Sequence, residues 1–134
     1  MKYLLDSDTF SLLVKKVPSV IDRALKAGIS NLYISTISEL EIRTGLALKN
    51  DPNLYLSVSE ALERVGILDF DSSAATEGAK VRAFLRGAGK PSGNLDSLIA
   101  GHALSLDAVL VTNNTKHFEN VPGLVVDNWV AAGG

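Results

Sequence analysis

The chain has 134 residues, a net charge of −2, 46% hydrophobic residues and no cysteine. This composition argues against disorder, and the length suits one domain over residues 1–134 with its own core. The absence of cysteine excludes disulfides and thiolate metal sites. Because no apolar run is long enough to span a membrane and residues 1–6 do not resemble a signal peptide, we expect a cytoplasmic protein. Any nucleic acid must bind to a local basic patch, since the chain as a whole is not a polycation.

The hydrophobic pattern alternates between short apolar runs and segments with helical spacing. In chain order it predicts a strand over 2–5, helices over 10–14 and 18–27, a strand over 31–34, helices over 35–49 and 54–65, a strand over 67–70, a helix over 72–88 capped by Asp71, a loop over 87–93, a helix over 95–106 capped by Asn94, a strand over 108–111, a helical turn at 117–118 and a strand over 124–126. We expect Trp129 to pack back on the body of the domain. Strands that alternate with helices predict an α/β domain with a mostly parallel sheet.

Local capping signals also precede the helices over 10–14 and 35–49. Ser7, Asp8 and Thr9 can each cap the helix over 10–14, so Asp6 is not needed for that role. The helix over 35–49 opens with two overlapping capping boxes, Thr36 with Glu39 and Ser38 with Glu41. Because one of them excludes the other, we expect one glutamate to remain free for another role.

Several polar residues fall where parallel strands end. Asp6 closes the first strand, Asn113 and Asn114 follow the strand over 108–111, Asp96 begins a helix, and Glu41 follows the second strand. Taken alone, each has an ordinary explanation as a helix cap, a turn or a solvated side chain. Gathered at one sheet edge, the carboxylates would repel one another, and Mg²⁺ or Mn²⁺ would relieve that repulsion. This chemistry suggests metal-assisted hydrolysis of a phosphodiester.

Basic residues near this edge give weak support for a polyanionic substrate. They are Arg82, Arg86, Lys90, Lys116 and His117. His102 is expected to be packed or solvated on its helix. No second histidine stands at metal-ligand spacing from it, which argues against zinc.

Four segments together resemble the successive motifs of PIN domains, and most closely the VapC group of toxin–antitoxin ribonucleases. These segments are residues 3–8, 34–45, 93–104 and 110–118. The family's acidic positions fall on Asp6, Glu41 and Asp96, and its fourth position falls on Asn114, or less readily on Asn113. That fourth position is an amide here, and Asp8 stands where the family usually has asparagine.

The resemblance implies a PIN-like three-layer α/β/α domain around a mostly parallel sheet of four to five strands. It also implies an Mg²⁺- or Mn²⁺-dependent endoribonuclease that acts as the toxin of a type II pair. Asp6 and Asp96 would bind the ion, Glu41 would help to bind it or act as the base, and Asn114 would hold a water. The implied partners are an RNA substrate, a second copy of the chain, and a VapB-like antitoxin whose C-terminal segment lies across the acidic groove.

Three other functions compete with this interpretation. Asp6 and Asp8 resemble the paired acids of a haloacid-dehalogenase phosphatase, but Phe10 occupies a position where that family needs Thr or Val. A phospho-receiver domain would need a lysine at the end of its last strand, where Asp127 stands instead. A PIN-like module that binds RNA without cleaving it stays open at this point.

Overall fold

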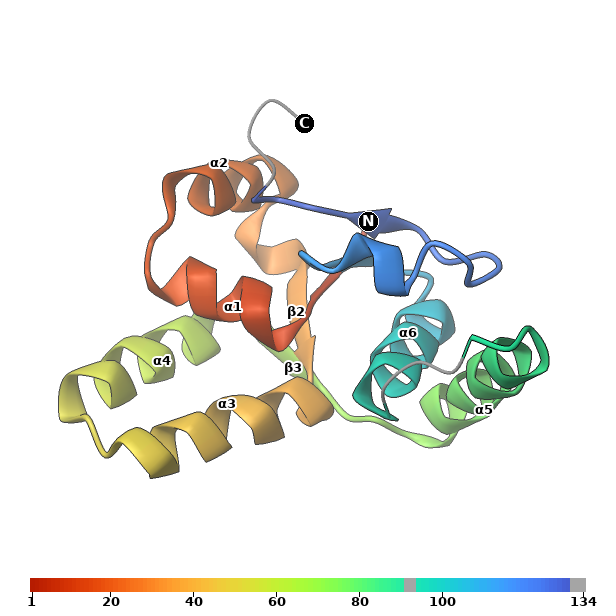
Figure 1. Ribbon diagram of the computed structural model, residues 1–134. Helices are drawn as coiled ribbons and strands as arrows, with labels where there is room; N and C mark the ends of the chain where they lie inside the picture. The colour runs from red at the N-terminus through yellow and green to blue at the C-terminus, as the bar shows by residue number, and fades with distance from the viewer. Residues whose placement is uncertain (91–93, 131–134) are drawn as a thin grey trace.

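A five-stranded parallel sheet lies at the centre of the computed structural model, which describes residues 1–90 and 94–130 (Figure 1). Its strand order is β3-β2-β1-β4-β5, so the first strand of the chain is the middle strand of the sheet. The bounds are β1 Tyr3–Leu5, β2 Leu32–Ser35, β3 Gly66–Leu68, β4 Val109–Val111 and β5 Val126–Asp127. Receiver domains have the strand order 2-1-3-4-5 instead. The observed order therefore excludes the receiver interpretation.

Helices cover both faces of this sheet (Figure 1). The bounds are α1 Ser7–Val14, α2 Pro18–Ala27, α3 Thr36–Lys49, α4 Pro52–Arg64, α5 Ser72–Gly87 and α6 Asn94–Leu106, with 3₁₀ turns at Ile29–Asn31 and Thr115–His117. In Figure 1, α1 to α4 lie on one side of the strands and α5 and α6 lie on the other. The three-layer α/β/α fold and the parallel sheet are thus confirmed.

The alternation of side chains along β1 and β4 divides the core in two. Leu4 and Leu110 pack in a cluster with residues of α5 and α6. Leu5 and Val111 point the other way and pack in a cluster that contains Phe10 of α1 and Trp129. Because both faces of these strands are buried, their sequence is continuously apolar rather than alternating. Because these strands are packed on both faces, the polar residues that follow them are held in fixed positions at the carboxyl edge of the sheet.

Two strands differ from the sequence prediction for local reasons. β3 ends at Leu68 rather than Phe70, because the Phe70 backbone N–H donates to the Thr36 hydroxyl instead of to a neighbouring strand. β5 begins at Val126 rather than Leu124, because the Leu124 N–H closes a turn on the Val121 carbonyl. β1, β2 and β4 differ from the prediction by one residue at one or both ends, and several helix ends shift by a few residues. Part of the loop expected over 87–93 lies outside the described residues.

The predicted caps of α1 and α3 are wrong. Asp6 itself caps α1, with its Oδ1 accepting from the Thr9 N–H at 2.8 Å. Ser35 caps α3 by accepting from the Ile37 N–H. Neither capping box forms, because the helix starts one residue before the first box requires and Ser38 is buried inside it.

Other local predictions are confirmed. Asp71 caps α5 through the Ala74 N–H. Trp129 is buried, and its Nε1 donates to Asp127 Oδ2 at 3.2 Å, so the segment after β5 packs back on the body of the domain. The cap predicted at Asn94 is not confirmed, because Asn94 is itself the first residue of α6. None of the helices described has the length and apolar composition needed to cross a bilayer.

Candidate active site

A small acidic hollow lies at the carboxyl edge of the sheet. Its volume is about 160 Å³. We call it the acidic hollow, and its lining residues are Asp6, Ser7, Asp8, Glu41, Leu95, Asp96, Ile99, Thr112, Asn114 and Phe118. The four residues assigned to the site from the sequence, Asp6, Glu41, Asp96 and Asn114, therefore all face one space. Asp6 follows β1, Asn114 follows β4, and the other two stand on α3 and α6.

Asp6 is fixed at the end of the central strand by hydrogen bonds on both sides. Its backbone N–H donates to the Val111 carbonyl at 3.1 Å, and its Oδ1 accepts from the Thr9 N–H. Burial raises the pKa of its carboxyl above the ordinary value of 3.8, and the negative charge of Asp8 adds to this effect. Hydrogen bonds from Thr112 and Thr9 oppose the increase. The site therefore holds Asp6 in one position but makes its negative charge costly.

Thr112 connects the end of β4 to Asp6. It is fully buried, its hydroxyl hydrogen-bonds the Asp6 carboxylate, and its Oγ1 accepts from the Asn114 N–H at 3.1 Å. This second bond turns the chain so that Asn114 lines the acidic hollow. Asn113 does not line it, and its Oδ1 is buried without a hydrogen-bond partner among residues 1–90 and 94–130. Of the two asparagines left open by the sequence, the structure thus places Asn114 at the hollow.

Glu41 reaches the hollow from the second turn of α3. Burial raises the pKa of its carboxyl above 4.5, and the charges of Asp8, Asp6 and Asp96 raise it further. The Ser7 hydroxyl donates to Glu41 Oε1 at 3.2 Å and lowers the pKa, though less than burial raises it. A carboxylate whose pKa is raised in this way accepts a proton more readily than an isolated one, as a general base must.

Asp96, in the first turn of α6, contacts a residue from beyond β4. His117 Nδ1 lies 3.1 Å from Asp96 Oδ2. Because an ionised carboxylate can only accept, Nδ1 must carry the proton in this contact. The sequence indicated His117 only as part of a weak basic group, and its contact with Asp96 was missed. Ser7 and Thr112 were also missed as partners of the carboxylates, although each stands next to a strand end.

The acidic hollow has the donor set of a hard-cation site, but its side chains are not converged. Among residues 1–90 and 94–130, no three His, Asp or Glu side chains are arranged to hold an ion as they stand. Glu41 and Asp96 are each bonded to a neighbour, Ser7 and His117. Mutual repulsion is nevertheless visible in the raised pKa of Glu41, and a divalent cation is the partner that relieves it. The oxygen-only donor set fits Mg²⁺ or Mn²⁺.

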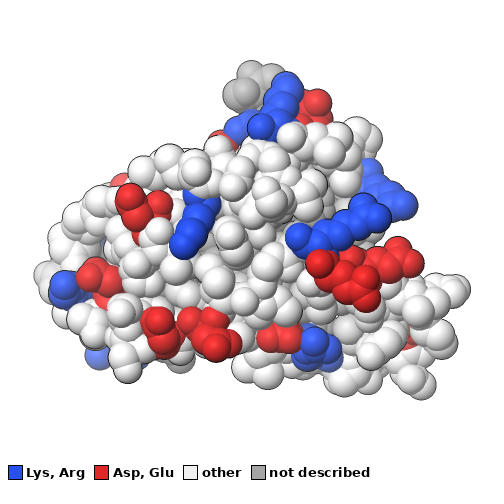
Figure 2. Space-filling view, turned by 180° about the vertical axis from the view of Figure 1, so that it is seen from behind, with Lys and Arg blue, Asp and Glu red and all other residues white. Residues whose placement is uncertain are grey.

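Charge on the opposite face of the molecule is mixed. Figure 2, seen from behind the view of Figure 1, shows Lys and Arg side chains lying beside Asp and Glu side chains. This face therefore lacks the broad basic surface that binding to a long polyanion requires. It agrees with the net charge of −2 and directs attention to local cations close to the acidic hollow.

Comparison with known proteins agrees with this geometry. The PIN domain family matches residues 3–124. The tRNA(fMet)-specific endonuclease VapC of Shigella flexneri is 34% identical over 130 residues, which cover 96% of this chain and 98% of that protein. The same enzyme of Salmonella typhimurium is 35% identical over the same coverage.

Solved structures show the same fold. The crystal structure of VapBC2 from Rickettsia felis, bound to a DNA fragment from its promoter, matches with a TM-score of 0.89 and 30% identity over 96% of this chain and 99% of that one. Both the match to the family and the identity to these relatives extend over nearly the whole chain. The chain therefore belongs to the PIN domain family and, within it, to the VapC ribonucleases.

Proposed function

We propose that this chain is an Mg²⁺- or Mn²⁺-dependent endoribonuclease and the toxin of a type II toxin–antitoxin pair. The observation that carries the proposal is that Asp6, Glu41 and Asp96, from three separate elements, all line one acidic hollow of about 160 Å³. The curated relatives are VapC ribonucleases, and two of them are named for tRNA(fMet). That tRNA is the substrate to test first.

Asp6 and Asp96 would hold the ion, with Glu41 as the third carboxylate. Bound there, the ion would neutralise phosphate charge and lower the pKa of a water molecule. The amide of Asn114 replaces a fourth carboxylate and adds no charge. The net negative charge of the site is therefore lower than with four acids, which favours one ion over two.

The reaction we propose is an attack of water on phosphorus. A bond forms from the water oxygen to phosphorus, the bond from phosphorus to the 3′ oxygen breaks, and the 3′ oxygen takes a proton from solvent. Glu41 accepts the proton of the attacking water, a role that its raised pKa suits. Thr112 and Thr9 keep the Asp6 carboxylate in place, and Asn114 orients a water through its amide.

The proposed partners follow from the relatives. The neighbouring solved structures are VapBC complexes, which supports a VapB-like antitoxin as the partner of this chain. We further propose a homodimer of a single domain over residues 1–134. Exposed apolar side chains near the α3–α4 turn, Leu48, Tyr55 and Leu56, offer a surface for a second copy. Light scattering on the purified chain measures this directly.

The decisive experiment is cleavage of end-labelled tRNA(fMet) and of an unstructured RNA with Mg²⁺ or Mn²⁺. We expect cleavage by the unaltered chain and none with EDTA. Asp96→Asn should lower the rate at least about 100-fold, because metal assistance supplies several kcal/mol. Asp22→Asn is the matched control, since Asp22 is exposed on α2 and pairs with Lys26. Cleavage that survives both EDTA and Asp96→Asn would contradict the proposal.

A further inference from the structure

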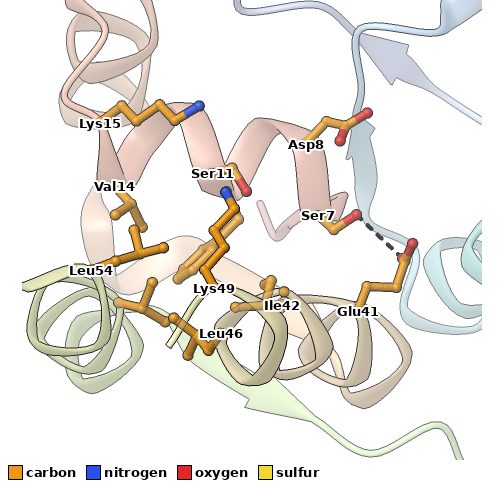
Figure 3. Close-up of a pocket in the computed structure, with 13 residues that line it drawn as sticks. Ser7, Asp8, Ser11, Val14, Lys15, Glu41, Ile42, Leu46, Lys49 and Leu54 are labelled. Carbon is orange, nitrogen blue, oxygen red and sulfur yellow. Dashed lines mark hydrogen bonds between the residues drawn. The ribbon is translucent and has the colours of Figure 1, made fainter. Parts of the chain in front are cut away.

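A second hollow, between α1, α3 and α4, opens beside the acidic hollow (Figure 3). Its volume is about 280 Å³, close to the lower limit of about 300 Å³ for small-molecule sites. We call it the α1–α3–α4 groove. Ser7, Asp8 and Glu41 line both spaces, so the two adjoin. The reaction proposed above uses the acidic end and leaves the rest of the groove without a role.

The far end of the groove is basic. Lys15, at the end of α1, and Lys49, the last residue of α3, both line it. In Figure 3 the Lys49 amino group lies beside Ser11 and Lys15 extends along α1 on the same side of the groove, while Asp8 and Glu41 lie at the other end. Neither lysine forms an ion pair with any residue in the described part of the chain. The groove therefore runs from a group of carboxylates to a pair of free cations.

One face of α3 forms the floor between these ends. Glu41, Gly45 and Lys49 are spaced four residues apart, which places them on one side of the helix. A Cβ built on Gly45 would have no heavy atom within 4 Å. Glycine lowers helix stability relative to alanine, and packing within the chain does not require it here. The space above Gly45 is thus free for something that is not part of the chain.

The walls of the groove are apolar. They are formed by half-buried side chains of three helices, Val14, Ile42, Leu46 and Leu54. A flat apolar group can lie between such walls, whereas a charged group would lose its hydration there without a partner. The groove therefore combines an apolar slot with a cationic end. Sites for single-stranded nucleic acid likewise join a cationic groove to an apolar surface for the bases, although that surface is aromatic there and mostly aliphatic here.

We propose that the α1–α3–α4 groove holds the nucleotide next to the cleaved phosphate of a single-stranded RNA. Its base lies over Gly45 between Ile42 and Leu46, and its outer phosphate is held by Lys15, Lys49 and the Ser11 hydroxyl. The cleaved phosphate then falls at the acidic end, beside Glu41. This inference rests on the proposed ribonuclease function and adds a binding site for substrate to it.

The lysines have another explanation, which the experiment must separate from this one. A lysine at the end of a helix stabilises the helix dipole, and both Lys15 and Lys49 stand at such ends. Lys26 provides the matched control, because it lies in the last turn of α2 but does not line the groove. All three lysines interact with a helix dipole, whereas only Lys15 and Lys49 are expected to contact RNA phosphate.

The first test measures RNA affinity without cleavage. A fluorescein-labelled single-stranded RNA is titrated with Mg²⁺ present into chains that carry Asp96→Asn together with Lys15→Gln, Lys49→Gln or Lys26→Gln. Lys15→Gln and Lys49→Gln should each weaken RNA binding about fourfold at 0.15 M salt. Each should also reduce the slope of log affinity against log salt by about 0.7. Lys26→Gln should leave both unchanged.

The second test fills the space above Gly45. Gly45→Leu should raise the thermal midpoint, because leucine is a better helix former, and should weaken RNA binding by blocking the base. Thr44→Leu adds the same side chain at the neighbouring exposed position and should leave RNA binding unchanged. A loss of binding with a raised midpoint cannot be attributed to unfolding.

The outcomes separate this inference from the function on which it rests. If the unaltered chain cleaves RNA but the groove variants bind RNA as their parent does, the groove inference is wrong and the function stands. If the unaltered chain neither binds nor cleaves RNA, both are overturned. If the variants keep RNA affinity but lose co-purification with the antitoxin, the groove is a peptide site and the inference is overturned.

Discussion

Gly101 of α6 packs directly on Gly78 of α5. A Cβ built on Gly101 would lie 2.3 Å from both the Cα and the N of Gly78, so the two helix backbones are in contact there. Gly101→Ala must push the helices apart and should destabilise the fold by about 1–3 kcal/mol. Because Asp96 stands on α6, the displacement of this helix should also lower the rate of RNA cleavage. Urea unfolding measures the first effect.

The matched variant is Gly78→Ala. Its added Cβ would meet the Ser97 carbonyl oxygen at 3.6 Å and Phe70 at 3.8 Å, which is ordinary contact. We expect a change within about 1 kcal/mol, with a gain in helix propensity offsetting small strain. Equal losses for the two alanines would show that the close approach at Gly101 does not set the spacing of α5 and α6.

Asp6 should be a liability for stability at neutral pH. Because the pKa of Asp6 is raised in the folded state, its carboxyl ionises at a lower pH in the unfolded chain than in the folded one. The stability that Asp6 contributes below pH 3.8 is therefore lost as the pH rises through its folded pKa. Asp6→Asn keeps the cap on Thr9 and should equal or exceed the unaltered chain at pH 7, with an advantage that grows from pH 4 to pH 7. Asp6→Ala also loses the cap and should cost about 1 kcal/mol. Denaturant unfolding across this range decides the sign, and an Asn advantage that shrinks with rising pH would contradict it.

Thr112 should matter through its hydroxyl. Thr112→Val keeps the shape but removes the group that bonds both Asp6 and the Asn114 N–H, so about 1–3 kcal/mol of stability should be lost. The pKa of Asp6 should rise further. The variant should have a lower kcat, while its KM should change less. Thr112→Ser retains the hydroxyl and should recover most of the activity. Identical kinetics for the Val and Ser variants would mean that the hydroxyl does not position Asp6.

Divalent cations should stabilise the folded chain. Binding to the native state alone adds stability by mass action, about 2.7 kcal/mol at a concentration of 100 times Kd. Mn²⁺ or Mg²⁺ should therefore raise the thermal midpoint of the unaltered chain and of Asp22→Asn, but much less that of Asp96→Asn. Scanning fluorimetry reads this without RNA. A shift of the same size in Asp96→Asn would place the ion elsewhere.

The sequence predicted the sheet, its parallel strands and the placement of Asp6 and Asp96 because each depends on one local feature. Buried strands are short apolar runs, and parallel strands bring their carboxyl ends to one edge. The caps predicted for α1 and α3 failed because Asp6, Ser35 and their neighbours are nearly equivalent acceptors for the first N–H groups of a helix, and small shifts of the helix start decide among them. Local pattern does not contain that information.

The contacts that hold the carboxylates were beyond the reach of the sequence. Ser7 and Glu41 are 34 residues apart, and Asp96 and His117 are 21 apart. Each pair meets because of the way whole helices pack, and neither spacing is a motif. The groove between α1, α3 and α4 was missed for the same reason, although Glu41, Gly45 and Lys49 already stand at helical spacing in the sequence.

The central place of β1 has a consequence for synthesis of the protein. Among the residues of the acidic hollow, Asp6 is the first to leave the ribosome. β4, which pairs with one side of β1, is made about a hundred residues later. The Asp6 carboxylate is therefore not held in place until Val111 and Thr112 have been synthesised. Long-range pairing of this kind is slow to form. A polypeptide interrupted before β4 should thus leave the cell's RNA intact.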